Sequence, residues 1–250
     1  QEAHGPLPTV KFSDQGVVEA HHDAACVDFA NQQLHVGAVW PSATQEEILF
    51  TVFPEAFPGL LFCETMLPNE AILISGLRQF VSTEGFQDTF RVIGPYSVPP
   101  ANQGRGRTMI AMDASMGGRL HDQCFGRDYC DRDICKAYIG FSSAVRICDQ
   151  QQQASVIATG NWGCGVFRNN PYVKFLQQLV AASLADVELL FYCLPAAGHI
   201  HPDLRHDLEA INAGIRKRNL SVLQIHKELG KYDGAEDRAA LRRYILDGFA

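Results

Sequence analysis

The sequence lacks the long hydrophobic runs and the targeting signal that would direct a chain into or across a membrane. Its 250 residues contain no uninterrupted apolar run of about 20 residues, the length that a transmembrane helix requires. The first residues do not follow the order of basic, apolar and small residues that is typical of a signal peptide. We therefore expect an intracellular protein, nuclear or cytoplasmic, that does not act at a membrane.

Positive charge is also scarce, with 21 Lys and Arg against 28 Asp and Glu and a net charge of −7. This balance argues against broad, sequence-independent binding of nucleic acid, which usually needs a basic face. A polyanionic substrate is still compatible with it if backbone N–H groups hold the anion locally. The one basic cluster, Arg105 and Arg107, lies in the Gly/Pro-rich stretch 95–107. We expect this stretch to be a solvated loop.

Cysteine is neither dense enough for a disulfide scaffold nor spaced as in the common zinc sites. Several of the eight cysteines lie inside apolar runs, where buried free thiols are typical. Five residues separate Cys124 from Cys130 and four separate Cys130 from Cys135, and no histidine follows at the usual interval. We therefore expect structural thiols, no metal and no other cofactor.

Apolar runs that are typical of buried strands alternate with helical patterns. The strand-like runs are 25–30, 71–75, 108–113, 155–159 and 187–193, and helical spacing is found in 171–185, 201–218 and 221–232. Continuous apolar strands favour a sheet that is covered on both faces, and the alternation indicates a layered α/β fold. No repeat or boundary divides the chain, so we predict one domain over residues 1–250. Its first 20 residues or so are expected to wrap the core.

Two adjacent acids, Glu46 and Glu47, follow a helix-start pattern. Ser42 and Gln45 have the spacing of a capping box, which predicts that a helix begins here and that both acids lie in its first turn. Acids at this position commonly complement the helix dipole and cap free N–H groups. Taken alone, the pair therefore favours a structural role.

The neighbouring motifs favour a chemical role instead. Asp28 and Asn31 come at the end of a predicted strand, and a Gly-rich turn, 158–167, follows a second strand. Ligand sites of α/β sheets open at such strand ends, and glycines let a phosphate approach backbone N–H groups. A carboxylic acid beside a bound sugar phosphate or nucleotide can protonate the leaving oxygen of a glycosidic bond. Burial and the adjacent negative charge must then raise its pKa against the helix dipole.

Three stretches, VDFAN (27–31), QEE (45–47) and ATGNWGCG (158–165), resemble the poly(ADP-ribose) glycohydrolase family. Weaker similarity continues through 69–80, 138–141 and the segment near the C-terminus. The resemblance implies a three-layer α/β/α macrodomain-like fold with a central mixed sheet and extra helices. It also implies a monomer that acts on ADP-ribose or poly(ADP-ribose) carried by modified proteins.

The resemblance assigns a role to each matching residue. Glu47 would be the general acid/base that cleaves the ribose–ribose bond. Glu46 would position the linkage through the sugar hydroxyls. Asn31, with Asp28 behind it, would orient the terminal ribose. The remaining substrate-binding positions are Glu19 and Gln45 near the adenine, Phe167 beside the ribose, and Asn161, Gly163, Cys164 and Gly165 around the diphosphate.

The chain departs from the family pattern at three places. The family's glycine triplet before QEE is His35, Val36 and Gly37 here, which would narrow or reshape the pocket. Phe86 takes the place of a tyrosine that stacks at the adenine side, and a second family aromatic near the adenine aligns with Tyr192. The leading hypothesis is release of ADP-ribose from poly(ADP-ribose). Hydrolysis of single protein-linked ADP-ribose units and non-catalytic binding of ADP-ribose are the alternatives.

Overall fold

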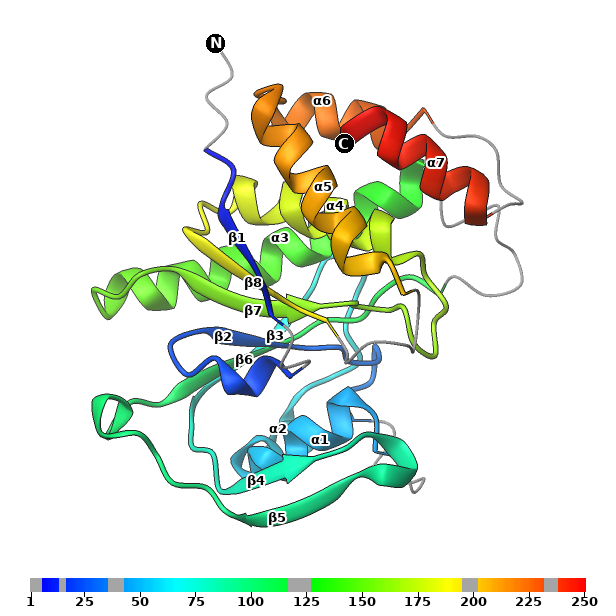
Figure 1. Cartoon of the computed structure of the whole chain (residues 1–250). Coiled ribbons are helices and arrows are strands. Elements are labelled where there is room, and N and C mark those ends of the chain that lie inside the picture. Colours follow the sequence, from blue (N-terminus) through cyan, green and yellow to red (C-terminus); the bar gives the residue numbers. More distant parts are fainter. Residues whose placement is uncertain (1–5, 14–16, 36–42, 117–126, 195–201, 232–237) are drawn as a thin grey trace.

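The computed structural model of the chain describes residues 6–13, 17–35, 43–116, 127–194, 202–231 and 238–250. A central sheet is covered by helices on both faces (Figure 1), which confirms the predicted three-layer α/β/α arrangement. The strands are β1 (Thr9–Ser13), β2 (Ala25–Asp28), β3 (Ile72–Leu77), β4 (Val81–Glu84), β5 (Arg91–Pro95), β6 (Arg107–Ala111), β7 (Val156–Gly160) and β8 (Leu189–Cys193). The α-helices are α1 (Gln45–Val52), α2 (Gly59–Phe62), α3 (Arg127–Gln150), α4 (Pro171–Leu184), α5 (Leu204–Lys217), α6 (Val222–Leu229) and α7 (Arg238–Phe249). Short 3-10 helices cover Val18–Ala20, Pro54–Ala56, Gln87–Thr89 and Pro100–Asn102.

The main sheet has the described strand order β1-β8-β7-β2-β6-β3. All neighbouring pairs are parallel except β3 and β6, so the sheet is mixed as predicted. The carboxyl ends of β2, β6, β7 and β8 consequently lie along one edge. Ligand sites of α/β sheets usually open at this edge.

Alternate side chains of each strand enter different cores. On one face Cys26, Met109 and Ala158 pack with α1, which buries Leu49 and Phe50. On the other face Val27, Ile110 and Ile157 pack against α3 and α4. A third cluster joins the outer side of α4 to α5, α6 and α7, which form the extra helices of the prediction. Among the described residues, no helix is both long enough and apolar enough to cross a bilayer.

The strands and helices predicted from long apolar runs are confirmed, but several elements were missed. The N-terminal segment does more than wrap the core, since Thr9–Ser13 is an edge strand that pairs with β8. Its alternation is only five residues long and gives little signal. The β4–β5 hairpin is largely exposed and carries no apolar run. Helices α3 and α7 were also not predicted from the sequence.

Buried ion pairs fix α3, α4 and the end of β6 to one another. Asp113, which follows β6, bonds to Lys136 at 2.5 Å and to Arg132, and Asp133 bonds to Arg132 at 2.8 Å and to Lys174. Burial raises the pKa of Asp133, but Lys174 and Arg132 outweigh it, and the pKa lies below the ordinary value. The paired charges make this packing well defined because an unpaired buried charge would be costly.

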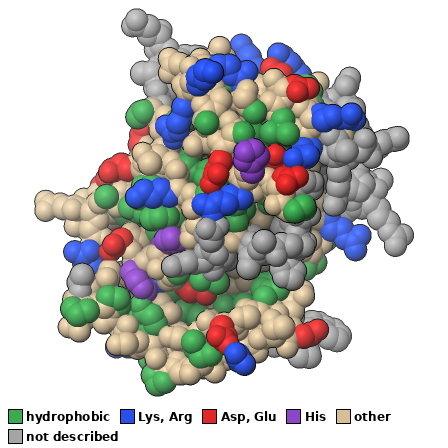
Figure 2. All heavy atoms as spheres, viewed as in Figure 1, with side chains coloured by type: hydrophobic (Ala, Val, Ile, Leu, Met, Phe, Trp, Pro, Cys, Tyr) green, Lys and Arg blue, Asp and Glu red, His purple; other side chains and the backbone are tan. Residues whose placement is uncertain are grey.

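The prediction of a solvated basic loop is correct for Arg105 and wrong for Arg107. Arg105 is exposed, but Arg107 begins β6 and is buried. Its guanidinium donates to the backbone oxygens of Glu19 at 2.6 Å and His21 at 2.9 Å. These bonds anchor the segment before β2, so Arg107 is structural. On the face shown in Figure 2, positive and negative side chains are mixed over the upper helical layer.

Candidate active site

Helix α1 begins at a capping box that differs from the predicted one. Thr44 is the N-cap, and the Oε2 atom of Glu47 accepts a hydrogen bond from the Thr44 backbone N–H at 2.8 Å and from its hydroxyl. The predicted partners were Ser42, which lies outside the described residues, and Gln45. Both bonds end on Oε2, so the cap does not use the second carboxylate oxygen of Glu47.

Gln45 connects the first turn of α1 to the end of β2. Its Oε1 atom accepts from the Phe29 backbone N–H at 2.7 Å, and its Nε2 atom donates to the Val27 backbone oxygen at 2.8 Å. The amide therefore sets the position of the two following glutamates relative to the sheet. These two bonds do not support the expected position of Gln45 near the adenine.

Glu46 points inward and is 4% exposed. Its carboxylate accepts from the backbone N–H of His35 at 2.6 Å and from that of Asn31. Burial, together with the charge of the adjacent Glu47, raises the pKa of Glu46 to about 7, although the two bonds from His35 and Asn31 lower it. Asn31, which is half-buried, is thus brought next to the acids by its own backbone.

Asp28 completes a group of three acids. Its side chain is fully buried, and neither of its carboxyl oxygens has a hydrogen-bond partner in the described part of the chain. Burial raises the pKa of Asp28 well above the ordinary value, and the charges of Glu46 and Glu47 add to this. Among the described residues, no Lys or Arg forms an ion pair with Asp28, Glu46 or Glu47. The fold therefore neutralises Asp113 and Asp133 with bases but leaves this acidic group without one.

The raised pKa of Glu46 makes the stability of the protein depend on pH. Since the folded-state pKa of about 7 exceeds the ordinary value of 4.5, protonation of Glu46 stabilises the fold below pH 4.5. This contribution is lost as the pH rises through 7. We expect Glu46→Gln to remove the loss, so the free energy of unfolding of the parent should fall relative to the variant by up to about 3 kcal/mol between pH 5 and pH 8.

Urea unfolding at several pH values, with a chelator present, measures this difference. Glu64→Gln is the control, because Glu64 is an exposed acid and its removal should leave the pH profile unchanged. Parallel profiles for the parent and Glu46→Gln would show that Glu46 titrates normally.

The Gly-rich turn after β7 is anchored to the buried core. Trp162 is fully buried, donates from Nε1 to the Met112 backbone oxygen at 2.9 Å, and has the Lys174 ammonium 4.3 Å from its ring centroid. Gly163 has a φ of +72°, and a Cβ there would lie 2.5 Å from the Ala114 Cβ atom. The Gly163 backbone oxygen accepts from the Asn169 side chain at 3.0 Å. Gly163 is therefore required by the fold of the turn itself.

The side of the same turn that does not pack on the core is open. Within the described residues, the backbone N–H groups of Gly163, Gly165, Val166 and Phe167 donate to no protein acceptor. A Cβ placed on Gly165 would meet no atom within 4 Å, so packing does not require a glycine at that position. Unused N–H groups in a Gly-rich turn are a suitable cradle for an anion.

The acids and the turn lie at the same edge of the sheet. They follow β2 and β7, which are parallel neighbours. The Phe29 ring packs on Gly160, where an added Cβ would lie 3.6 Å from its Cζ atom. The structure thus brings together two motifs that are about 115 residues apart in the chain.

Phe86 and Phe167 have partly open positions. Phe86 is 49% exposed, and the backbone N–H of Gln87 donates to the Ala43 backbone oxygen at 2.9 Å, so Phe86 lies next to the start of α1. Phe167 is half-buried against the core under α3 and α4. Cys164 is half-buried, and its thiol donates to the Trp162 backbone oxygen at 3.7 Å. Gly37 lies outside the described residues.

Tyr192 does not fit the role assigned to it. Its ring is fully buried next to Phe12 and Phe175, in the cluster that joins α4 to α5, α6 and α7, so it has no surface for an adenine. Its hydroxyl reaches the Asn161 side-chain oxygen at 3.4 Å, so it supports the turn from inside. Glu19 is buried in the 3-10 helix before β2, and burial raises its pKa.

His35 was noted in the sequence only as a departure from a glycine pattern. Its imidazole is 5% exposed and packs against Phe50 and Phe57, with ring centroids 4.2 and 5.3 Å away. A nitrogen of this ring and carboxylate oxygens of Glu46 and Glu47 lie within 4.8 Å of one another. His35 is therefore part of the acidic site, and only its place in the loop before QEE could have indicated this.

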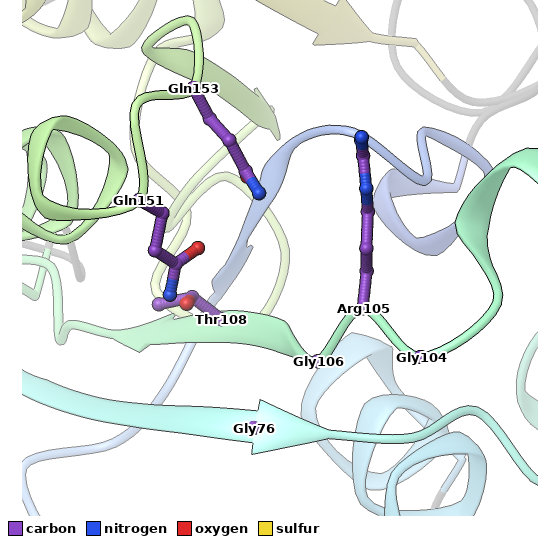
Figure 3. Close-up of a pocket in the computed structure, with 7 residues that line it drawn as sticks. All are labelled: Gly76, Gly104, Arg105, Gly106, Thr108, Gln151 and Gln153. Atoms are coloured by element: carbon purple, nitrogen blue, oxygen red, sulfur yellow. The ribbon is translucent and has the colours of Figure 1, made fainter.

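A separate pocket of about 260 Å³ lies at the amino ends of β6 and β7 (Figure 3). It is lined by Gly76, Gly104, Arg105, Gly106, Thr108, Gln151 and Gln153. None of these residues belongs to the acidic group or to the Gly-rich turn. The pocket is thus distinct from the candidate active site.

Comparisons with known proteins agree with the fold and with the family that the sequence resembles. The family model for the poly(ADP-ribose) glycohydrolase (PARG) catalytic region, described as a macro domain fold, matches residues 1–199. Poly(ADP-ribose) glycohydrolase 1 of Caenorhabditis elegans is 35% identical over 198 residues, which are 74% of this chain and 25% of the worm protein. Probable poly(ADP-ribose) glycohydrolase 2 of Arabidopsis thaliana is 27% identical over 227 residues, 75% of this chain and 42% of the plant protein. The chain therefore spans less than half the length of these relatives.

Solved structures with the same fold include two bacterial glycohydrolases. The poly(ADP-ribose) glycohydrolase of Thermomonospora curvata has a TM-score of 0.56 at 15% identity and covers 84% of this chain and 78% of its own. The T267R mutant of the Deinococcus radiodurans enzyme, in complex with ADP-ribose, has a TM-score of 0.54 at 18% identity, with coverage of 83% and 87%. At these identities the likeness establishes the fold.

Proposed function

Because the chain belongs to the poly(ADP-ribose) glycohydrolase family, we propose that it hydrolyses the ribosyl O-glycosidic bond of poly(ADP-ribose) and releases ADP-ribose. The observation that carries the proposal is the position of Glu46 and Glu47 at the sheet edge that also holds the open Gly-rich turn. The acids transfer protons, and the backbone N–H groups of the turn bind the diphosphate. The substrate is the end of a polymer on a modified protein, and the chain acts on it as a monomer.

Glu47 is the proposed catalytic acid because it can reach a substrate. Asp28 and Glu46 are buried, whereas Glu47 is half-buried and keeps one carboxylate oxygen outside the cap. Protonated Glu47 gives its proton to the leaving ribose oxygen as the bond to the anomeric carbon breaks. Water then attacks that carbon, and its proton passes to the Glu47 carboxylate, which restores the acid.

The proposed roles of the neighbours follow from their burial. Glu46 retains a proton up to about pH 7 and faces the loop of Asn31, so it can hold a sugar hydroxyl in place. Asp28 is fully buried near Glu46 and Glu47, and burial raises its pKa, so it lies behind the acids and does not touch the substrate. The free N–H groups of Gly163 and Gly165 would bind the diphosphate.

His35 favours a second candidate, hydrolysis of a single ADP-ribose unit on a protein side chain. Its ring occupies space that the family's glycine leaves free, and this would hinder a second ADP-ribose unit beside the acids. Parallel assays with polymer and with mono-modified protein distinguish the two substrates. Faster release from the mono-modified protein would favour the second candidate.

Incubation of the chain with labelled poly(ADP-ribose), followed by chromatography of the products, tests the proposed function. The expected product is monomeric ADP-ribose, which accumulates from the start of the reaction. Tight calorimetric binding of ADP-ribose without any release from polymer or from mono-modified protein would identify a binding module instead.

Two glycines of the turn provide a matched pair of variants. Gly165→Ala should leave the free energy of unfolding within about 0.5 kcal/mol of the parent, because open space surrounds the position. It should weaken ADP-ribose binding, since the new methyl group projects toward the anion. Gly163→Ala should instead destabilise the fold by about 1–3 kcal/mol through its positive φ and the contact with Ala114.

Calorimetry with ADP-ribose and urea unfolding measure the two effects separately. If Gly165→Ala bound ADP-ribose as tightly as the parent, the diphosphate would have to lie elsewhere.

A further inference from the structure

We propose that His35, Glu46 and Glu47 form a binding site for a divalent transition-metal cation such as Zn²⁺. The three side chains provide one imidazole nitrogen and two carboxylate oxygens that lie within 4.8 Å of one another. This set of donors is typical of zinc sites in proteins. Donors on one tetrahedral zinc lie about 3.3 Å apart, so small side-chain rotations suffice to close the site.

The first support is a group of acids without a basic partner. The buried Glu46 and Asp28 and the half-buried Glu47 lie close together, and the described residues offer none of them a Lys or Arg as an ion-pair partner. Elsewhere the same fold pairs its buried acids, as at Asp113 and Asp133. A bound divalent cation would supply the positive partner that these carboxyl groups lack among the described residues.

The second support is a pair of polar groups without partners. The ring of His35 is buried against Phe50 and Phe57, and its Nδ1 atom has no hydrogen-bond partner among the residues that the structure describes. Asp28, which is fully buried near the glutamates, has no hydrogen-bond partner on either oxygen within the described ranges. Buried polar groups are rarely left unpaired, and a cation held by His35 and the two glutamates would give the imidazole a partner.

The backbone also fixes His35 toward the acids. Its φ is +50°, an unusual value for a residue with a side chain, and its N–H donates to Glu46 at 2.6 Å. The two aromatic contacts restrain the ring on its other side. The histidine is therefore preorganised next to the carboxylates, which lowers the cost of binding a metal.

If the proposed function holds, a metal at this site inhibits it. A carboxylate oxygen of Glu47 that is bound to a metal cannot carry the proton that the leaving ribose needs. The cation would also occupy the space in front of Glu46. Metal occupancy thus switches the site off without disturbing the Gly-rich turn.

Cobalt binding tests the site without reference to activity. Co²⁺ is added to protein freed of metal with a chelator, and binding is followed by calorimetry and by the visible absorption of the cobalt. We expect one equivalent to bind without thiolate charge-transfer absorption. His35→Gly, which suits the positive φ, and His35→Phe, which keeps the ring packing, should each weaken binding by at least about tenfold.

His206→Ala is the matched control, because His206 is an exposed histidine on α5 and its loss should leave cobalt binding unchanged. Circular dichroism of every variant verifies its fold. Equal cobalt affinity of the parent, His35→Gly and His35→Phe would overturn the proposal. Absorption typical of a thiolate ligand in the parent would also overturn it, because the cation would then lie at a cysteine.

Inhibition of ADP-ribose release by the bound metal is measured separately from metal binding. Cobalt should slow ADP-ribose release by the parent and leave each His35 variant at its own metal-free rate. Binding without any change in rate would overturn the inhibition but retain the site. Absence of polymer cleavage in metal-free parent protein would instead refute the proposed function, whatever the binding result.

Discussion

Replacement of Glu47 by Gln is expected to lower the rate of ADP-ribose release by about 10²–10⁴-fold, the usual contribution of a general acid. The amide cannot donate the proton that the leaving ribose oxygen requires. It still offers an oxygen to Thr44, so the capping box and the start of α1 should persist. ADP-ribose should therefore bind the variant nearly as well as the parent. Steady-state kinetics with labelled polymer and calorimetry with ADP-ribose measure the two quantities.

Glu64→Gln is the matched control, since it removes a carboxylate from an exposed position. Its rate should equal that of the parent. A Glu47→Gln variant that released ADP-ribose at the rate of the control would exclude Glu47 as the acid. The proton would then have to come from another group, and Glu46 is the nearest one with a raised pKa.

Replacement of Lys174 by Met is expected to destabilise the protein by about 3 kcal/mol, the lower part of the range for breaking a buried ion pair. Lys174 is 1% exposed and bonds to Asp133, which is itself buried. Arg132 still pairs with Asp133 in the variant, and this limits the loss. The change also removes the cation over the Trp162 ring, so the Gly-rich turn should become less rigid.

Urea unfolding measures the loss of stability, and the fluorescence of Trp162 reports on the turn. The double variant Lys174→Met with Asp133→Asn should recover part of the loss, because no unpaired charge remains in the core. Lys227→Met, on the exposed side of α6, is the control and should unfold as the parent does. Equal stability of the Lys174 and Lys227 variants would show that the buried pair contributes nothing.

The layered fold could be predicted because its central strands are continuously apolar. Strands such as β7 and β8 are buried on both faces, and their sequences show this directly. Helix α3 was not predicted because several side chains of its buried face are small. This face has helical spacing but little apolar bulk, and it consists of Cys130, Ile134, Ala137, Phe141 and Ala144. The exposed β4–β5 hairpin gives no apolar signal at all.

The position of the site could be predicted, but its internal contacts could not. Strand-end motifs place Asp28 and the Gly-rich turn at one sheet edge whatever their separation in sequence. Which acid is buried depends on the rotation of α1, and this is set by Thr44 and by the two bonds of Gln45. The burial of Tyr192 likewise depends on which face of β8 it occupies.

A crystal structure of the chain with ADP-ribose tests the central claim most directly, because it locates the ligand relative to both motifs. We predict that the diphosphate accepts hydrogen bonds from the N–H groups of Gly163 and Gly165, and that the terminal ribose lies within hydrogen-bonding distance of the Glu47 carboxyl group. ADP-ribose bound away from these residues, for example in the pocket beside Arg105 and Gln153, would contradict the account.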